Sequence, residues 1–394
     1  MTVYSKIALV ILIFYLYFQY KIKTITTPVN IEIYNIIDSI THTIDNQQLI
    51  SYDSDNYAQN FGEYSYITNI YNTSKYIIGI TENIEKTNNN KYVLWLPGLG
   101  DVFCHPFVTK ELIKKGYDIY AIDLPNIGFA QYNNKKYLNY PTVGEIIGYL
   151  NAAIQLIDSK YNNPQRVIYG ISLGSVIALY YIKLYPTVFS KCVLNGPYID
   201  RDLNDLDNYI TDAKAFLYLL YNFNFKFKSG ELSKLCLSMA MYDIRPYGIS
   251  KNYINDIITY YSTNETIKNP QTIMRLENGH GRYLIKSNDY LIIKFFAYFF
   301  NYHNITTIYN IPTLILCSDI SVHADNVCLD LNDKYFGLKK YGDLAVNINC
   351  IKNNCKDMFS NYKIVQLNEA SHDVFYSEKE IRNQAIREFL NFLI

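Results

Sequence analysis

The chain has 394 residues with 36 Lys+Arg and 36 Asp+Glu, so its formal net charge at neutral pH is zero. Nucleic acid is excluded as a main partner, because phosphate binding needs clustered positive charge and the sequence has no basic block. The charged fraction of 18% and the hydrophobic fraction of 49% exclude a disordered chain and indicate a folded protein with its own core.

An uncharged apolar run lies near the start of the chain, from Ile7 to Tyr20, with lysines on both sides. As a helix it would measure about 21 Å, against about 30 Å for the hydrocarbon core of a bilayer. Flanking lysines can reach the headgroups and narrow that gap. We expect residues 1–23 to anchor the protein to a membrane, in an orientation that the lysines leave open. A signal peptide and a buried or frayed helix are the alternatives, although no small-x-small cleavage site precedes Lys21.

Residues 24–60 are polar and rich in Thr and Asn, which predicts a linker. From about residue 61, short β-branched and aromatic runs alternate with helical patterns, so a single α/β domain is expected over residues 61–394. The predicted strands are 64–71, 75–81, 91–96, 117–124, 166–171, 192–195, 313–317 and 362–367. The predicted helices are 106–115, 142–161, 174–184 and 378–393. This alternation predicts a mostly parallel central sheet with helices on both faces.

The alternation breaks at about residues 200–308, where the pattern is helical and rich in aromatic residues. We interpret this stretch as an insertion into the α/β domain. Runs such as AFLYLLYNF and IIKFFAYFF would suit an acyl chain, although ordinary helix packing explains each run taken separately.

Seven cysteines are scattered through the chain without a CxxC pair. Cys350 and Cys355 have no His or second cysteine pair at the spacing of a zinc site, so we expect neither a metal nor another cofactor. Isolated cysteines in an odd number fit buried packing in a reducing compartment.

The strongest chemical signal is Gly170-Ile171-Ser172-Leu173-Gly174, a G-x-S-x-G motif. It follows a predicted strand and opens a predicted helix, which is the arrangement of a nucleophile elbow. There the serine has a strained backbone, and the glycines let neighbouring segments approach without a Cβ. We therefore interpret Ser172 as a nucleophile; a structural serine in a Gly-rich turn is the alternative.

A serine nucleophile needs a general base and an acid that orients it. His372 follows the last predicted strand, 200 residues after Ser172, in the chain order Ser…acid…His. The acid is expected in the loop after residues 313–317, where Asp319 lies two residues past the strand and Asp325 eight. Position at the strand end favours Asp319, but a longer loop can bring Asp325 back, so both are candidates, with Asp330 as a distant third.

Two backbone amides are expected to form an oxyanion hole. One is that of Leu173, directly after the nucleophile, and the other is that of Leu99, in the glycine-containing loop after residues 91–96. Asp101 and His105 lie in the same loop, and we interpret them as possible supporting groups beside the reacting residues. A phosphate-binding loop is the competing interpretation of the glycine pair, but no Lys-Ser/Thr follows it.

Taken together, these motifs resemble the α/β-hydrolase superfamily, in its serine-aminopeptidase and monoacylglycerol-lipase branch. The resemblance covers about residues 60–199 and 310–394. It is carried by LPGLGDVFCHP, YDIYAIDLPNIGFA, GISLGS, LNGPYID and EASHDVF. It implies an α/β-hydrolase fold with Ser172 as nucleophile and His372 as base, and it implies that the insertion is a lid over the active site.

The chain departs from the family pattern in three places. Pro97 stands where a His is usual, and residues 126–129 replace a Gly-His-Gly-type turn. In the lipase-like subgroup that the first and last motifs resemble, the acid lies farther along its loop, which favours Asp325 over Asp319. These departures concern the substrate class more than the fold.

The expected function is hydrolysis of a small-molecule carboxylic ester, lipid-like in character, through an acyl-enzyme. Peptidases and thioesterases of the same fold share the triad, so they are alternatives within the enzyme class. A membrane-tethered binding protein with an inactive hydrolase fold is the alternative outside it, although such proteins usually lose a triad residue. The expected location is at a membrane through the N-terminal segment, and the oligomeric state is open.

Overall fold

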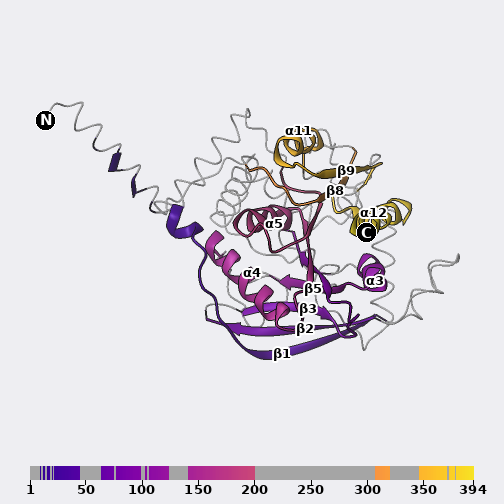
Figure 1. Ribbon diagram of the computed structural model, residues 1–394, viewed down its shortest axis with the longest axis horizontal. Helices are drawn as coiled ribbons and strands as arrows, with labels where there is room; N and C mark the ends of the chain where they lie inside the picture. The colour runs from indigo at the N-terminus through magenta and orange to yellow at the C-terminus, as the bar shows by residue number, and fades with distance from the viewer. Residues whose placement is uncertain are drawn as a thin grey trace, which may run out of the picture.

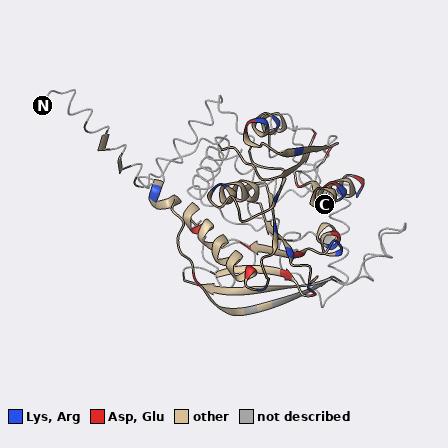
Figure 2. Cartoon of the chain, in the orientation of Figure 1, with Lys and Arg blue, Asp and Glu red and all other residues tan. Residues whose placement is uncertain are grey.

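The computed structural model describes residues 22–44, 64–74, 77–98, 103, 106–123, 141–199, 307–319, 346–370, 372–377 and 379–394, with residues 9, 12–13, 16–17 and 20 upstream. Within these residues the chain forms one nine-stranded sheet in the order β1-β2-β3-β5-β4-β6-β7-β8-β9 (Figure 1). Lys and Arg are interspersed with Asp and Glu over its elements (Figure 2).

The sheet is antiparallel at one end and parallel over the rest. The strands are β1 (Ile33–Ile44), β2 (Tyr64–Thr73), β3 (Ile77–Asn83), β4 (Lys91–Leu96), β5 (Asp118–Asp123), β6 (Gln165–Ile171), β7 (Lys191–Asn195), β8 (Thr313–Ser318) and β9 (Tyr362–Leu367). β1, β2, β3 and β5 pair antiparallel in that order, and every pairing from β5 through β4 to β9 is parallel. The carboxyl ends of β4 and β6–β8 therefore meet at one edge, where ligands bind in sheets of this kind.

Helices cover both faces of the sheet. They are α3 (Pro106–Lys114), α4 (Val143–Asp158), α5 (Leu173–Leu184), α11 (Ile348–Met358) and α12 (Lys379–Leu393). α4, α5 and α11 pack on one face, and α3 and α12 on the other (Figure 1). Successive side chains of a strand point to opposite faces, so each buried strand packs against both helix layers. In β4, Leu94 points to the first face and Val93 and Trp95 point to the second.

The structure confirms the predicted parallel sheet with helices on both faces, and the predicted elements correspond to β2–β9, α3, α4, α5 and α12. The prediction of a linker over residues 24–60 is wrong for Ile33–Ile44, which form the edge strand β1. Register shifts in its pairing with β2 interrupt the two-residue alternation that marks a strand in sequence. The helix α11 was not predicted either, although its buried residues Ile348, Ile351, Cys355 and Met358 recur at helical spacing, which is the signal that could have found it.

The segment before β1 packs along α4. The Val29 amide donates to the Gly144 carbonyl at 3.0 Å. A Cβ on Gly144 would lie 2.7 Å from the carbonyl carbon of Thr27, and one on Gly148 would lie 2.9 Å from Ile31, so these glycines make room for the segment. Upstream, helical positions such as Leu16 are exposed. No helix in the part of the chain that the structure describes is long and apolar enough to cross a membrane. The expected lid falls outside the described residues apart from its last two positions.

Candidate active site

Ser172 lies at the sharp turn between β6 and α5. Its backbone angles are φ 50° and ψ −117°, a conformation that residues with a Cβ rarely adopt, and its side chain is buried. A Cβ on Gly170 would lie 2.6 Å from the Gly174 oxygen, and a Cβ on Gly174 would lie 2.9 Å from the carbonyl carbon of Leu96. Both glycines of the motif are therefore required by close backbone approach, as expected for a nucleophile elbow.

Hydrogen bonds hold the backbone of the elbow on both sides. The Ser172 amide donates to the Asn195 carbonyl at the end of β7, at 3.0 Å. The Ser172 carbonyl accepts from the Ser175 amide at 3.1 Å and from the Ser175 hydroxyl. These contacts stabilise a conformation that would otherwise cost about 1–3 kcal/mol.

The loop after β4 lies directly against the elbow. Pro97 and Gly98 are buried, and the Pro97 carbonyl faces the Gly174 position. Leu173 is the first residue of α5, so its amide is one of those that a helix leaves without an intrahelical acceptor. The other expected oxyanion donor, Leu99, and the supporting candidates Asp101 and His105 lie outside the described residues.

His372 follows β9 and is buried beside the elbow. Its imidazole packs on the backbone of Gly196, where a Cβ would lie 2.9 Å from Nδ1 and 3.1 Å from Cε1. Gly196 directly follows Asn195, whose carbonyl accepts the Ser172 amide. The structure thus brings the two residues that the sequence singles out, 200 positions apart, to the same peptide at the carboxyl end of β7.

Of the two acid candidates, the structure describes Asp319. This residue follows β8 and is exposed. Its amide donates to the Leu367 carbonyl at 3.0 Å, and its carboxylate accepts the Glu369 amide at 2.8 Å. Asp319 therefore holds the turn between β9 and His372. Asp325 lies outside the described residues.

Asn195 and Asp373 make contacts that sequence reasoning missed. The Asn195 amide nitrogen donates to the Asp373 carboxylate at 2.7 Å and to the Tyr169 hydroxyl at 2.6 Å, and its oxygen accepts the Val374 amide at 3.1 Å. The Asp373 carboxylate also accepts the Phe375 amide at 3.0 Å. The motifs LNGPYID and EASHDVF contain these residues, but the bonds join positions 178 residues apart, which local sequence cannot reveal.

A cluster of aromatic side chains packs around Tyr169, whose hydroxyl accepts from the Asn195 amide nitrogen. The rings of Trp95 and Tyr169 are 3.7 Å apart between centroids, and Phe375 lies 6.0 Å and Phe389 5.9 Å from Tyr169. Such pairs contribute about 0.5–1.5 kcal/mol each beyond the area they bury. They join β4, β6, α12 and the His372 loop into one support for the site.

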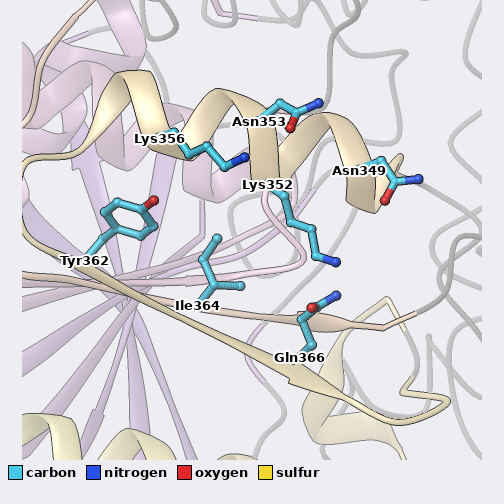
Figure 3. Close-up of a pocket in the computed structure, with 7 residues that line it drawn as sticks. All are labelled: Asn349, Lys352, Asn353, Lys356, Tyr362, Ile364 and Gln366. Atoms are coloured by element: carbon cyan, nitrogen blue, oxygen red, sulfur yellow. The ribbon is translucent and has the colours of Figure 1, made fainter.

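A separate cavity of about 390 Å³ opens at the outer edge of the sheet, between α11 and β9 (Figure 3). Its lining includes Lys352, Lys356 and Gln366, and none of the candidate catalytic residues. Among the described residues there is no group of three or more His, Cys, Asp or Glu side chains that could hold a metal ion.

The fold and the elbow define the class of protein. The chain belongs to the α/β hydrolase fold family, whose model matches residues 92–344, over half of the chain. A search of curated protein sequences found no match.

Two solved structures show the same fold. A thermostable carboxyl esterase from Bacillus coagulans is 13% identical, with a TM-score of 0.53, and the match covers 81% of this chain and 94% of the esterase. A soluble variant of monoglyceride lipase from Saccharomyces cerevisiae is 14% identical, with a TM-score of 0.51, and the match covers 82% and 93%. These similarities confirm the fold.

Proposed function

We propose that this protein is a serine hydrolase that cleaves carboxylic esters of lipid-like character. The observation that carries the proposal is the strained backbone of Ser172 at a strand-to-helix turn, with His372 packed beside the peptide that holds it. Backbone strain of this kind is retained where it serves a function. Membership of the α/β hydrolase fold family supports the same reaction class.

In the proposed reaction the Ser172 hydroxyl attacks the ester carbonyl carbon while His372 takes its proton. The amides of Leu173 and Leu99 donate to the oxyanion of the tetrahedral intermediate. His372 then gives the proton to the departing alcohol, which leaves an acyl-enzyme. Water, deprotonated by His372, attacks the acyl carbon and releases the acid and free Ser172.

For the acid of the triad we propose Asp325. A triad acid is buried and accepts the hydrogen of the imidazole Nδ1. Asp319 is exposed and its carboxylate accepts the Glu369 amide, which suits a residue that holds the loop. Asp325 is the next aspartate along the chain, six residues after Asp319, and the family resemblance favours an acid farther from the strand end.

We also propose that the N-terminal segment binds the protein to a membrane with the active site on the bilayer side. Asp158, at the end of α4, accepts hydrogen bonds from Tyr92 and Arg166 near the starts of β4 and β6. The start of α4 therefore lies toward the opposite edge, where these strands end and Ser172 follows. Residues 22–26 are helical and lead into Thr27, whose backbone packs on Gly144 at that start of α4 (Figure 1). A lipid-like substrate would reach the site directly from the bilayer.

The test compares Ser172→Ala with Ser190→Ala, a matched change at an exposed serine. Hydrolysis of short p-nitrophenyl esters and labelling by a fluorophosphonate should be abolished in the first variant and unchanged in the second. Unchanged hydrolysis in Ser172→Ala would overturn the proposal. Absence of labelling in the unmodified protein would favour an inactive binding protein, and a panel of thioesters and peptides would separate the related hydrolases.

A further inference from the structure

We infer that Asn195 is a positioning residue that fixes the nucleophile and the base relative to each other. The inference rests on the proposed function and adds a specific role to a residue that touches neither the substrate nor the reacting atoms. Its carbonyl accepts the Ser172 amide at 3.0 Å, and its side chain holds the two residues that follow His372. A single residue thus connects the elbow and the histidine loop.

Both the amide nitrogen and the amide oxygen of the Asn195 side chain are hydrogen-bonded. The side chain is completely buried, both hydrogens of its amide nitrogen are donated, to Asp373 and Tyr169, and its oxygen accepts the Val374 amide. A buried amide with all these partners has one orientation, because any other leaves polar groups without partners. The loop that carries His372 is therefore held at two points, the Asp373 carboxylate and the Val374 backbone.

The next residue extends the same connection. Gly196 has φ +48°, and the His372 imidazole lies on its backbone. A change in the side chain of Asn195 would therefore release the loop from one side while the imidazole still rests on the neighbouring peptide. Misplacing a catalytic group by 1 Å can cost about 10²-fold in rate. We expect Asn195→Ala to lower kcat by about that factor, with little change in KM.

A matched control exists far from the site. Asn83 in β3 is also buried, its amide nitrogen donates to the Asp118 carboxylate at 3.1 Å, and its oxygen accepts the Ile119 amide at 2.8 Å. Asn83→Ala removes the same kind of buried side-chain hydrogen bonds and should lower the free energy of unfolding as Asn195→Ala does. Its kcat should equal that of the unmodified protein, which separates positioning from general stability.

A swap of the two side chains provides the rescue test. Asn195→Asp places a second carboxylate against Asp373, so the pair repels unless it shares a proton. Relative to the unmodified protein, the activity of this variant should rise as the pH falls. Asn195→Asp combined with Asp373→Asn removes the repulsion and restores one donor and one acceptor between the two side chains. Because Oδ1 of Asp373 accepts both the Asn195 amide and the Phe375 amide, an Asn at 373 keeps only one of these two bonds, and recovery should be partial.

The experiment measures kcat, KM and the rate of fluorophosphonate labelling for these variants in the full chain, with urea unfolding as the measure of stability. Support requires a low kcat in Asn195→Ala and Asn195→Asp, recovery in the double variant, and normal kcat in Asn83→Ala. Normal kcat in Asn195→Ala, or no recovery in the double variant while it remains folded, would overturn the inference. Absence of labelling in the unmodified protein would instead overturn the proposed function.

Discussion

Replacing Gly196 by alanine would displace His372 by a predictable amount. The new Cβ would lie 2.9 Å from Nδ1 and 3.1 Å from Cε1 of the imidazole, whereas ordinary van der Waals contact begins at 3.4 Å. The carbonyl oxygen of His372 lies closer still, so the loop has to move by roughly 0.5–1 Å, a displacement of the size that can cost about 10²-fold in rate. Because Gly196 has φ +48°, alanine also adds about 1–2 kcal/mol of backbone strain.

The expected result is a kcat lower by about 10²-fold and a free energy of unfolding lower by about 1–2 kcal/mol. Gly116→Ala is the matched control, because Gly116 also has positive φ and its Cβ would meet the flexible side chain of Asn89, remote from Ser172. It should lose similar stability and keep its kcat. Steady-state hydrolysis of a p-nitrophenyl ester and urea unfolding measure both quantities.

The reasoning would be refuted if Gly196→Ala lost stability like Gly116→Ala and kept the kcat of the unmodified protein. That outcome would mean that the packing of the imidazole on Gly196 does not control its catalytic position. A low kcat in both variants would equally contradict a local effect, since Gly116 lies on the turn between α3 and β5.

Two further predictions concern the acid and a buried lysine. Asp325→Asn should lower kcat far more than Asp319→Asn, because the Asn at 319 can still accept the Glu369 amide; a larger loss in Asp319→Asn would identify Asp319 as the acid. Burial, with a contribution from Lys114, lowers the pKa of Lys110 to about 7. The cost of burying its charge is complete below that pH and falls as the pH rises toward 10.5, the ordinary lysine value. Lys110→Met should therefore raise the free energy of unfolding more at pH 6 than at pH 9, and a gain independent of pH would contradict the shift.

The sequence predicts a strand or helix correctly wherever the pattern that marks it lies within one short stretch of the chain. Buried strands such as β4 and β6 contain continuous apolar runs, and α5 begins at Leu173, inside a motif whose glycines allow close backbone approach. The strained turn at Ser172 could be predicted for the same reason, since the strand, the turn and the helix that define it are consecutive in the chain.

Tertiary structure decided the rest. β1 is a strand because β2 offers it an edge, and its own alternation is interrupted by register shifts. The role of Asn195 depends on hydrogen bonds to Ser172, Asp373 and Val374, and the two bonds from its side chain to the histidine loop span 178 and 179 residues. The residue type and its neighbours in sequence determine which backbone conformations are sterically allowed at a position. Which distant side chains then meet is determined by how the strands pair, and that pairing placed Ser172 and His372 at one peptide of β7.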